Sequence, residues 1–192
     1  MSREPRVVLL AAGGSRRLGR PKQFLRRGGV TLLHTRVALA RSIARKPPLV
    51  VTGAHGLAVA RSARLAGASV VHNPGWRAGM GCSLARGMRT VRPGTAVLVM
   101  SVDQYRVDSR DLEALLAAWR RHPWRPAAAA YDDTVGIPAI LPAGWRGQLL
   151  GLQGDQGAGA MLRRAGRRLS RVAMPHAATD VDYPRDWPSR TA

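Results

Sequence analysis

The chain has 192 residues, a hydrophobic fraction of 45% and a single cysteine, figures that favour one domain without disulfides or a cysteine-based zinc site. Its net charge of +20 comes almost wholly from arginines, some of them in scattered pairs, and only 5% of the residues are aromatic. This pattern favours a small polyanionic substrate over nucleic acid as the main partner.

The first apolar run, residues 7–12, is too short for a secretory leader and continues into two glycines and an arginine pair. No later stretch of the sequence reaches the roughly 18 apolar residues that a membrane helix requires. We therefore expect a cytoplasmic protein with no membrane partner, and the run is interpreted as a first strand.

Short apolar runs alternate with amphipathic stretches along the whole chain. The runs are rich in Val, Leu and Ala, and they predict strands covered on both faces at Arg6–Leu10, Leu49–Thr52, Ser69–His72, Ala96–Met100, Ala127–Tyr131 and Leu169–Ala173. The stretches between them predict helices at Leu32–Arg45, Gly56–Ala66, Cys82–Arg89, Arg110–Arg121, Trp145–Leu150 and Ala158–Ala165. Ser109 is expected to cap the fourth helix. The alternation predicts an α/β fold with a mostly parallel central sheet and helices on both faces, where ligands bind at the carboxyl ends of the strands.

A glycine-rich, cationic segment, residues 11–22, follows the first predicted strand. Its glycines allow the backbone to approach an anion closely, and its three arginines and Lys22 supply neutralising charge. It matches neither a Walker A loop nor a dinucleotide-binding fingerprint. A phosphate-binding loop is the favoured interpretation, and a solvated turn is the alternative.

Acidic residues follow the fourth strand and recur near the C-terminus. Asp103 stands where it could hold Mg²⁺ beside phosphate oxygens, although a turn-initiating aspartate is nearly as plausible. Three further carboxylates lie within the segment Asp180-Val181-Asp182-Tyr183-Pro184-Arg185-Asp186. They indicate either a metal site or a short helix with Asp182 as its N-cap. Capping is the safer assignment for Asp186.

Two further glycine-dense segments lead into predicted helices. Residues 73–84 run into a helix start whose first N–H groups could bind an anion, and residues 151–160 are a second glycine-dense approach to a helix. Cys82 is expected to be a packing residue. No histidine stands at a spacing that supports a hydrolase triad or a zinc protease site.

The run from Leu10 to Gly19 followed by Lys22 resembles the signature of nucleotidyltransferases with a glycosyltransferase-A-like, Rossmann-like fold. Further segments resemble the molybdenum cofactor cytidylyltransferases within that superfamily. They are Asn73-Pro74-Gly75-Trp76, Gly79-Met80, Ser83-Leu84, Asp103-Gln104, Gly136-Ile137-Pro138, Gly154-Asp155-Gln156-Gly157-Ala158 and the Asp180–Asp186 segment.

The resemblance implies transfer of CMP from CTP to the phosphate of molybdopterin or its molybdenum form, with Mg²⁺ and release of pyrophosphate. By resemblance, the catalytic residues are Arg17, Lys22 and Asp103, and the metal ligands are Asp103 with Asp180 or Asp182. The nucleotide would contact Leu10, Ala11, Ala12, Gly13, Gly14, Ser15, Arg17, Lys22, Asn73 and Ser83. The acceptor would contact Trp76, Gly79, Met80, Gly136, Pro138, Gly154, Asp155 and Gly157.

One domain, residues 1–192, is expected to have a nucleotide-binding half at about 1–105 and an acceptor-side half at about 106–192. A molybdoenzyme or a chaperone is the further partner that the resemblance suggests. Tyr105, Tyr183 and Arg185 depart from the family pattern and leave the acceptor open. The alternatives are a guanylyltransferase, a nucleotidyltransferase for another phosphorylated acceptor, or a non-catalytic protein that binds nucleic acid or an acidic partner.

Overall fold

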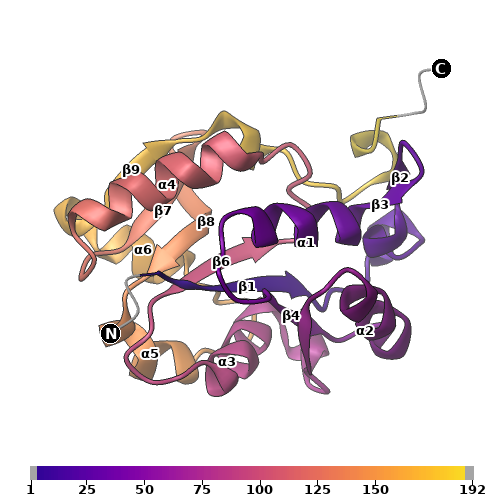
Figure 1. The fold of residues 1–192 in the computed structure, drawn as a ribbon, viewed down its shortest axis with the longest axis horizontal. Coiled ribbons are helices and arrows are strands. Elements are labelled where there is room, and N and C mark those ends of the chain that lie inside the picture. The colour runs from indigo at the N-terminus through magenta and orange to yellow at the C-terminus, as the bar shows by residue number, and fades with distance from the viewer. Residues whose placement is uncertain (1–3, 189–192) are drawn as a thin grey trace.

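The computed structural model describes residues 4–188, and a seven-stranded sheet lies at its centre in the order β5-β4-β1-β6-β8-β7-β9 (Figure 1). Its strands are β1 (Arg6–Ala11), β4 (Leu49–Thr52), β5 (Ser69–His72), β6 (Val97–Ser101), β7 (Ala127–Tyr131), β8 (Thr134–Leu141) and β9 (Ser170–Ala173). β8 runs antiparallel to both of its neighbours, and the other strands are parallel to one another. All six predicted strands are present, so the expected α/β fold with a mostly parallel sheet is confirmed.

The antiparallel strand β8 was not predicted, because Gly136 and Pro138 interrupt its apolar run and both residues weaken a strand assignment. A two-residue turn connects β7 to it, and Tyr131 pairs directly with Thr134. Asp132 and Asp133 form this turn with φ values of 45° and 57°, which match a type I′ hairpin turn. A short hairpin of β2 (Arg26–Arg27) and β3 (Val30–Thr31) lies outside the main sheet.

Within the part of the chain that the structure describes, six α-helices cover the two faces of the sheet, as predicted. They are α1 (Leu32–Ser42), α2 (Gly56–Leu65), α3 (Met80–Thr90), α4 (Ser109–Arg121), α5 (Arg146–Leu150) and α6 (Gly159–Arg164). Figure 1 shows α1 and α4 on one side of the sheet and α3 and α5 on the other. The expected cap of α4 was wrong by one residue: Asp108 is the N-cap and forms a capping box with Asp111.

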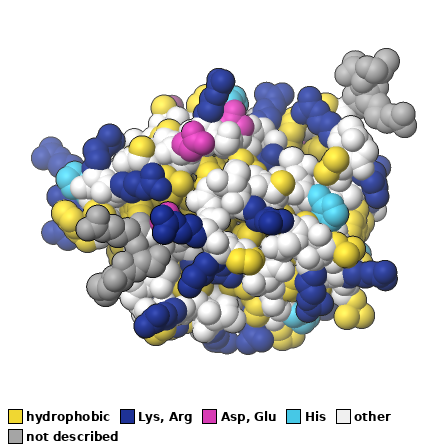
Figure 2. Space-filling view, in the orientation of Figure 1, with side chains coloured by type: hydrophobic (Ala, Val, Ile, Leu, Met, Phe, Trp, Pro, Cys, Tyr) yellow, Lys and Arg dark blue, Asp and Glu magenta, His cyan; other side chains and the backbone are white. Residues whose placement is uncertain are grey.

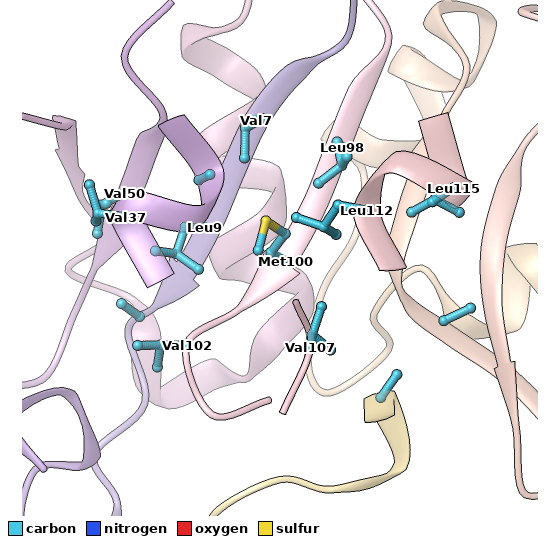
Figure 3. Packing of buried hydrophobic residues seen from close by; sticks show 14 of the residues in the cluster. Val7, Leu9, Val37, Val50, Leu98, Met100, Val102, Val107, Leu112 and Leu115 are labelled. Carbon is cyan, nitrogen blue, oxygen red and sulfur yellow. The ribbon is translucent and has the colours of Figure 1, made fainter. Parts of the chain in front are cut away.

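The alternation of side chains along the strands builds a separate hydrophobic core on each face. Leu9, Leu98 and Met100 pack with α1, α2 and α4 in one core (Figure 3). Val8 and Val99 point the other way and pack with α3, α5 and α6. Both cores therefore fix β1 and β6 firmly between helices.

The chain order of the strands reverses at β1, because β4 and β5 extend the sheet on one side and β6 on the other. In open α/β sheets a ligand crevice forms at such a reversal, beyond the carboxyl ends of the strands. The loops after β1 and β6 meet there. None of the helices within residues 4–188 has the length and apolar character needed to cross a membrane.

Candidate active site

The loop after β1 folds back on itself through two single-turn 3-10 helices, η1 (Arg16–Leu18) and η2 (Lys22–Phe24). Ser15 has a φ of 51° and accepts a 3.1 Å hydrogen bond from the Lys22 backbone N–H through its Oγ. This bond closes the loop and brings the Lys22 side chain back toward the end of β6.

Lys22 forms the centre of a charged cluster. Its Nζ lies 2.9 Å from Asp103 Oδ2 and 3.1 Å from Asp182 Oδ1, and its side chain is only 10% exposed. Burial lowers the pKa of this ammonium group, but the ion pairs and hydrogen bonds with Asp103 and Asp182 outweigh burial and leave the pKa raised. Lys22 is therefore held as a cation between two segments that are far apart in the sequence.

Arg17 contributes the second cation of the cluster from a more exposed position. Its guanidinium group pairs with Asp182, and it lies 5.2 Å from the centroid of the Tyr183 ring. Its side chain is 60% exposed.

The interpretation of Asp182 as the N-cap of a short helix was wrong. Tyr183 is the N-cap residue of the short turn η7 (Pro184–Asp186), and the Asp182 carboxylate instead pairs with Arg17 and Lys22. Asp186 has the expected capping role and accepts hydrogen bonds from the Asp182 and Tyr183 backbones.

The three carboxylates predicted as metal ligands come together in the fold. Ligand oxygens of Asp103, Asp180 and Asp182 all lie within 4.8 Å of one another. Partial burial and the neighbouring Asp103 and Asp182 raise the pKa of Asp180, and Lys22 acts in the opposite direction. A set of hard oxygen donors with excess negative charge suits Mg²⁺ or Mn²⁺, so these residues fit a divalent cation.

A cavity of about 300 Å³ opens beside this cluster, between the loops after β1 and β6 and the start of α3. Among the predicted site residues, those lining it are Leu10, Ala11, Ala12, Gly13, Lys22, Trp76, Gly79, Met80, Ser83, Asp103 and Asp155. Five residues that were not predicted as site residues line it too: Arg16, Gln23, Arg77, Ser101 and Val102. Arg16 and Arg77 belong to the scattered arginines, and their position follows only from the folded loops.

Other predicted residues lie behind the cavity wall or away from it. Asn73 is buried, donates a 3.0 Å hydrogen bond to Ser83 Oγ and accepts one from the Gly75 N–H, so it orients the loop before α3. Ser15 closes the loop after β1, and Gly14 packs against the Trp76 ring. Gly136 and Pro138 belong to β8 and do not line this cavity.

Two glycine-containing segments pack against each other at the wall of the cavity near the start of α3. The Gly81 N–H donates a 2.9 Å hydrogen bond to the Gly154 carbonyl, and Gly79 has a φ of 113°. A Cβ at Gly79 would overlap the Gly154 backbone and stand 2.5 Å from Asp155 Oδ1. Gly157 similarly leaves room for the Met80 sulfur. Close packing between the two segments therefore requires a glycine at position 79.

A second and wider groove of about 1300 Å³ lies along α5 and α6. Trp124, Trp145 and Met161 line it together with the arginines at positions 125, 163, 164, 167 and 168. Among the described residues that line it, none is acidic. The groove is larger than the cavity at β1 and β6, but among its described lining residues it has neither a lysine nor a carboxylate.

Comparison with known proteins gives a family and a set of similar structures. The family model for the MobA-like NTP transferase domain matches residues 7–172. The homologue of Mycobacterium tuberculosis Rv0371c from Mycobacterium sp. strain JC1 is 29% identical, with a TM-score of 0.76 over 97% of this chain and 94% of that chain. Rv0371c of M. tuberculosis H37Rv, solved as a complex with manganese, is 28% identical, with a TM-score of 0.75 over 94% of each chain.

A nucleotidyl transferase from Methanothermobacter shares the fold at 23% identity, with a TM-score of 0.76 over 94% of this chain and 93% of that chain. A search of curated protein sequences finds no match to the chain.

Proposed function

The chain belongs to the family of MobA-like NTP transferase domains, and from this premise we propose that it transfers CMP from CTP to the phosphate of molybdopterin or its molybdenum form. Pyrophosphate is the second product. The observation that carries the proposal is the Lys22 ammonium group, bonded to both Asp103 and Asp182 beside a glycine loop. This cluster joins the cation that a triphosphate needs to the carboxylates that a divalent metal needs.

The acceptor phosphate already carries the attacking oxygen, so the reaction requires no general base. This agrees with the cavity lining, which among the described residues contains no histidine and no glutamate. The oxygen attacks the α-phosphorus, and the bond to the leaving pyrophosphate breaks. The residues of the chain hold two polyanions in line and neutralise the charge that builds on the transferring group.

Each side chain has a part in this arrangement. Lys22 and Arg16 face the cavity and would neutralise the triphosphate, Lys22 as a compact charge and Arg16 as a bidentate donor. Arg17 holds Asp182 in place from outside the cavity and would reach the phosphates only by leaving that ion pair. The backbone of residues 11–13 would approach the nucleotide closely because Gly13 carries no side chain.

Asp103, Asp180 and Asp182 would hold the divalent cation, Mg²⁺ in the proposed reaction. Bound there, such a cation supplies Lewis-acid stabilisation of the phosphate oxygens. On the opposite wall, Trp76, Met80 and Asp155 would contact the acceptor.

The test is pyrophosphate release from CTP and from GTP with a molybdopterin acceptor and Mg²⁺. We expect Asp103→Asn to lower turnover by about 10²–10³-fold, the scale of a lost electrostatic group in an active site. Asp133→Asn, in the exposed β7–β8 turn, is the matched control and should leave turnover unchanged. Normal turnover of folded Asp103→Asn would remove the carboxylate cluster from the reaction.

The nucleotide and the acceptor are the parts of the proposal with alternatives. Release of pyrophosphate from GTP alone would make the protein a guanylyltransferase. Turnover only with a different phosphorylated acceptor would keep the chemistry and change the substrate. Tyr105 and Tyr183 depart from the family pattern and line a separate surface cavity beside Asp180 and Asp182. A different acceptor would contact the protein there.

The arginine-lined groove along α5 and α6 is the observation that favours a second class of function, binding of nucleic acid or an acidic partner without turnover. Figure 2 shows Lys and Arg side chains spread over one face of the molecule with few acidic side chains among them. This function predicts tight, strongly salt-dependent DNA binding that needs no divalent cation. The enzyme predicts nucleotide binding that requires a cation and is lost with Asp103.

The proposal includes the organisation expected from the sequence: one cytoplasmic domain with a nucleotide-binding half at about residues 1–105 and an acceptor-side half at about 106–192. A molybdoenzyme or a chaperone would receive the product. Separate expression of the two halves tests whether they form one domain. We expect neither half to fold alone, and a half that folds independently would contradict a single domain.

A further inference from the structure

Two buried glutamines each follow a charged residue of the active site directly in the chain. Gln23 follows Lys22 and is 0% exposed, and Gln104 follows Asp103 and is 6% exposed. Each donates from its Nε2 to two backbone carbonyls. In the part of the chain that the structure describes, neither Oε1 atom has a hydrogen-bond partner.

The Gln104 amide joins three segments of the fold. Its Nε2 lies 2.8 Å from the carbonyl oxygen of Ile137 on β8 and 2.9 Å from that of Ala177 in η6 (Pro175–Ala178). These two bonds fix the orientation of the amide, because a flipped amide would set Oε1 against two carbonyl oxygens. In this orientation Nε2 donates to both carbonyls, while the buried Oε1 accepts no hydrogen bond. A buried acceptor without a partner costs free energy of folding.

The backbone of Gln104 is anchored as well. Arg36, on α1, donates from Nη1 to the carbonyl oxygens of Gln104 at 3.1 Å and Val107 at 2.5 Å. Burial lowers the pKa of Arg36 to about 10, so its guanidinium group is still charged at neutral pH. Gln104 is therefore fixed at its main chain and at its side chain, and it cannot follow a movement of η6 without breaking one of these bonds.

Gln104 connects the two segments that carry the acidic cluster. Asp103 precedes it directly, and Ala177 stands shortly before Asp180 and Asp182 in the chain. We propose that Gln104 is a positioning residue: its amide sets the separation of Asp103 from Asp180 and Asp182, and thereby the affinity of this cluster for a divalent cation. The inference rests on the proposed function for the cluster's role as a cation site.

Gln23 provides the matched control within the same protein. Its Nε2 donates to the carbonyl oxygens of Ala11 at 2.9 Å and Gly13 at 3.2 Å, both in the loop after β1. Loss of this amide disturbs the glycine loop but cuts no connection between Asp103 and the C-terminal carboxylates. The two variants therefore remove the same chemical group and differ only in which segments come apart.

The test is a titration with Mn²⁺ alone, with free Mn²⁺ followed by electron paramagnetic resonance, on the native protein, Gln104→Met and Gln23→Met. Methionine keeps the length of the side chain and removes both donors. We expect Gln104→Met to weaken Mn²⁺ binding by about 10–100-fold, the usual effect of removing a group that orients metal ligands. Gln23→Met should leave Mn²⁺ affinity nearly unchanged and raise the KM for the nucleotide.

A lowered Tm of Gln104→Met with native Mn²⁺ affinity would overturn the inference, because it would show a structural role alone. Absence of Mn²⁺ binding by the native protein would overturn it too. If Gln104→Met does not fold, Gln104→Asn, which keeps the amide one methylene short of both carbonyls, takes its place, and unfolding of both variants refutes the positioning role. Weakened Mn²⁺ binding in a protein that transfers no CMP would support the inference while the proposed function fails.

Discussion

Substitution of Lys22 by methionine tests both the architecture and the chemistry of the candidate active site. The change removes the ammonium group that lies 2.9 Å from Asp103 and 3.1 Å from Asp182 and leaves these carboxylates facing each other. Breaking a buried ion pair costs about 3–5 kcal/mol. The carboxylates are 21% and 30% exposed, so water recovers part of that cost, and we expect about 2–3 kcal/mol of destabilisation.

For a chain of this size each kcal/mol lowers Tm by about 2–4 °C, so Tm of Lys22→Met should fall by about 4–12 °C. Turnover should fall by about 10²–10³-fold, because the triphosphate loses a fixed cation. Mn²⁺ should raise the Tm of the variant more than that of the native protein, since a divalent cation then neutralises the exposed carboxylates.

Differential scanning fluorimetry and pyrophosphate release measure these effects. The chain contains one other lysine, Lys46, which is exposed, and Lys46→Met is the matched control with native Tm and turnover. Turnover of Lys22→Met within about threefold of native would refute the assignment of Lys22 as an active-site cation, because lost electrostatic groups cost far more.

Other substitutions separate packing from binding. Gly79→Ala should lower Tm by at least about 4 °C, since the positive φ and the overlap with the Gly154 backbone together cost about 2–6 kcal/mol. Gly147→Ala, with open space around it, is the control, and equal Tm values would contradict the overlap. Gly13→Ala meets no atom within 4 Å and should keep the native Tm, while its methyl group lowers kcat/KM for CTP by about tenfold; an unchanged kcat/KM would place the nucleotide elsewhere. Asp180→Asn should raise the Tm of the metal-free protein at pH 7 and weaken Mn²⁺ binding by about 10–100-fold. The folded state raises the pKa of Asp180, so its charge destabilises the fold above that pKa, and the Tm difference should disappear as the pH falls below it.

The sheet was largely predictable from the sequence because its central strands are buried on both faces and read as continuous apolar runs. The antiparallel β8 was not, since Gly136 and Pro138 break its pattern and only the folded sheet shows the space that it fills. Its turn did carry a signal in Asp132-Asp133, a pair that tolerates the positive φ of a two-residue hairpin.

Some roles of site residues can also be predicted from the sequence, whereas others depend on contacts between distant segments. Lys22 and Asp103 are visible in the sequence because charged residues after two central strands converge at one edge of a parallel sheet. The positioning role proposed for Gln104 is not visible in the sequence. Its carbonyl partners at Ile137 and Ala177 lie 33 and 73 positions away, and any residue supplies a carbonyl. Short motifs therefore indicate which groups react, while the groups that set their spacing emerge from the tertiary contacts.

The charge balance of the cluster links metal binding to nucleotide binding. Lys22 and Arg17 are paired with Asp103 and Asp182, which leaves the negative charge of Asp180 in excess. Partial burial, together with the charges of Asp103 and Asp182, raises the pKa of Asp180. A cluster with one excess negative charge repels a triphosphate, whereas the same cluster holding a divalent cation attracts it. Nucleotide affinity should therefore rise with Mg²⁺ or Mn²⁺ in the native protein. The rise should be smaller in Asp180→Asn, whose cluster is already neutral without the cation, and isothermal titration of CTP with and without metal measures the difference. An equal gain in both proteins would show that Asp180 takes no part in coupling the cation to the nucleotide.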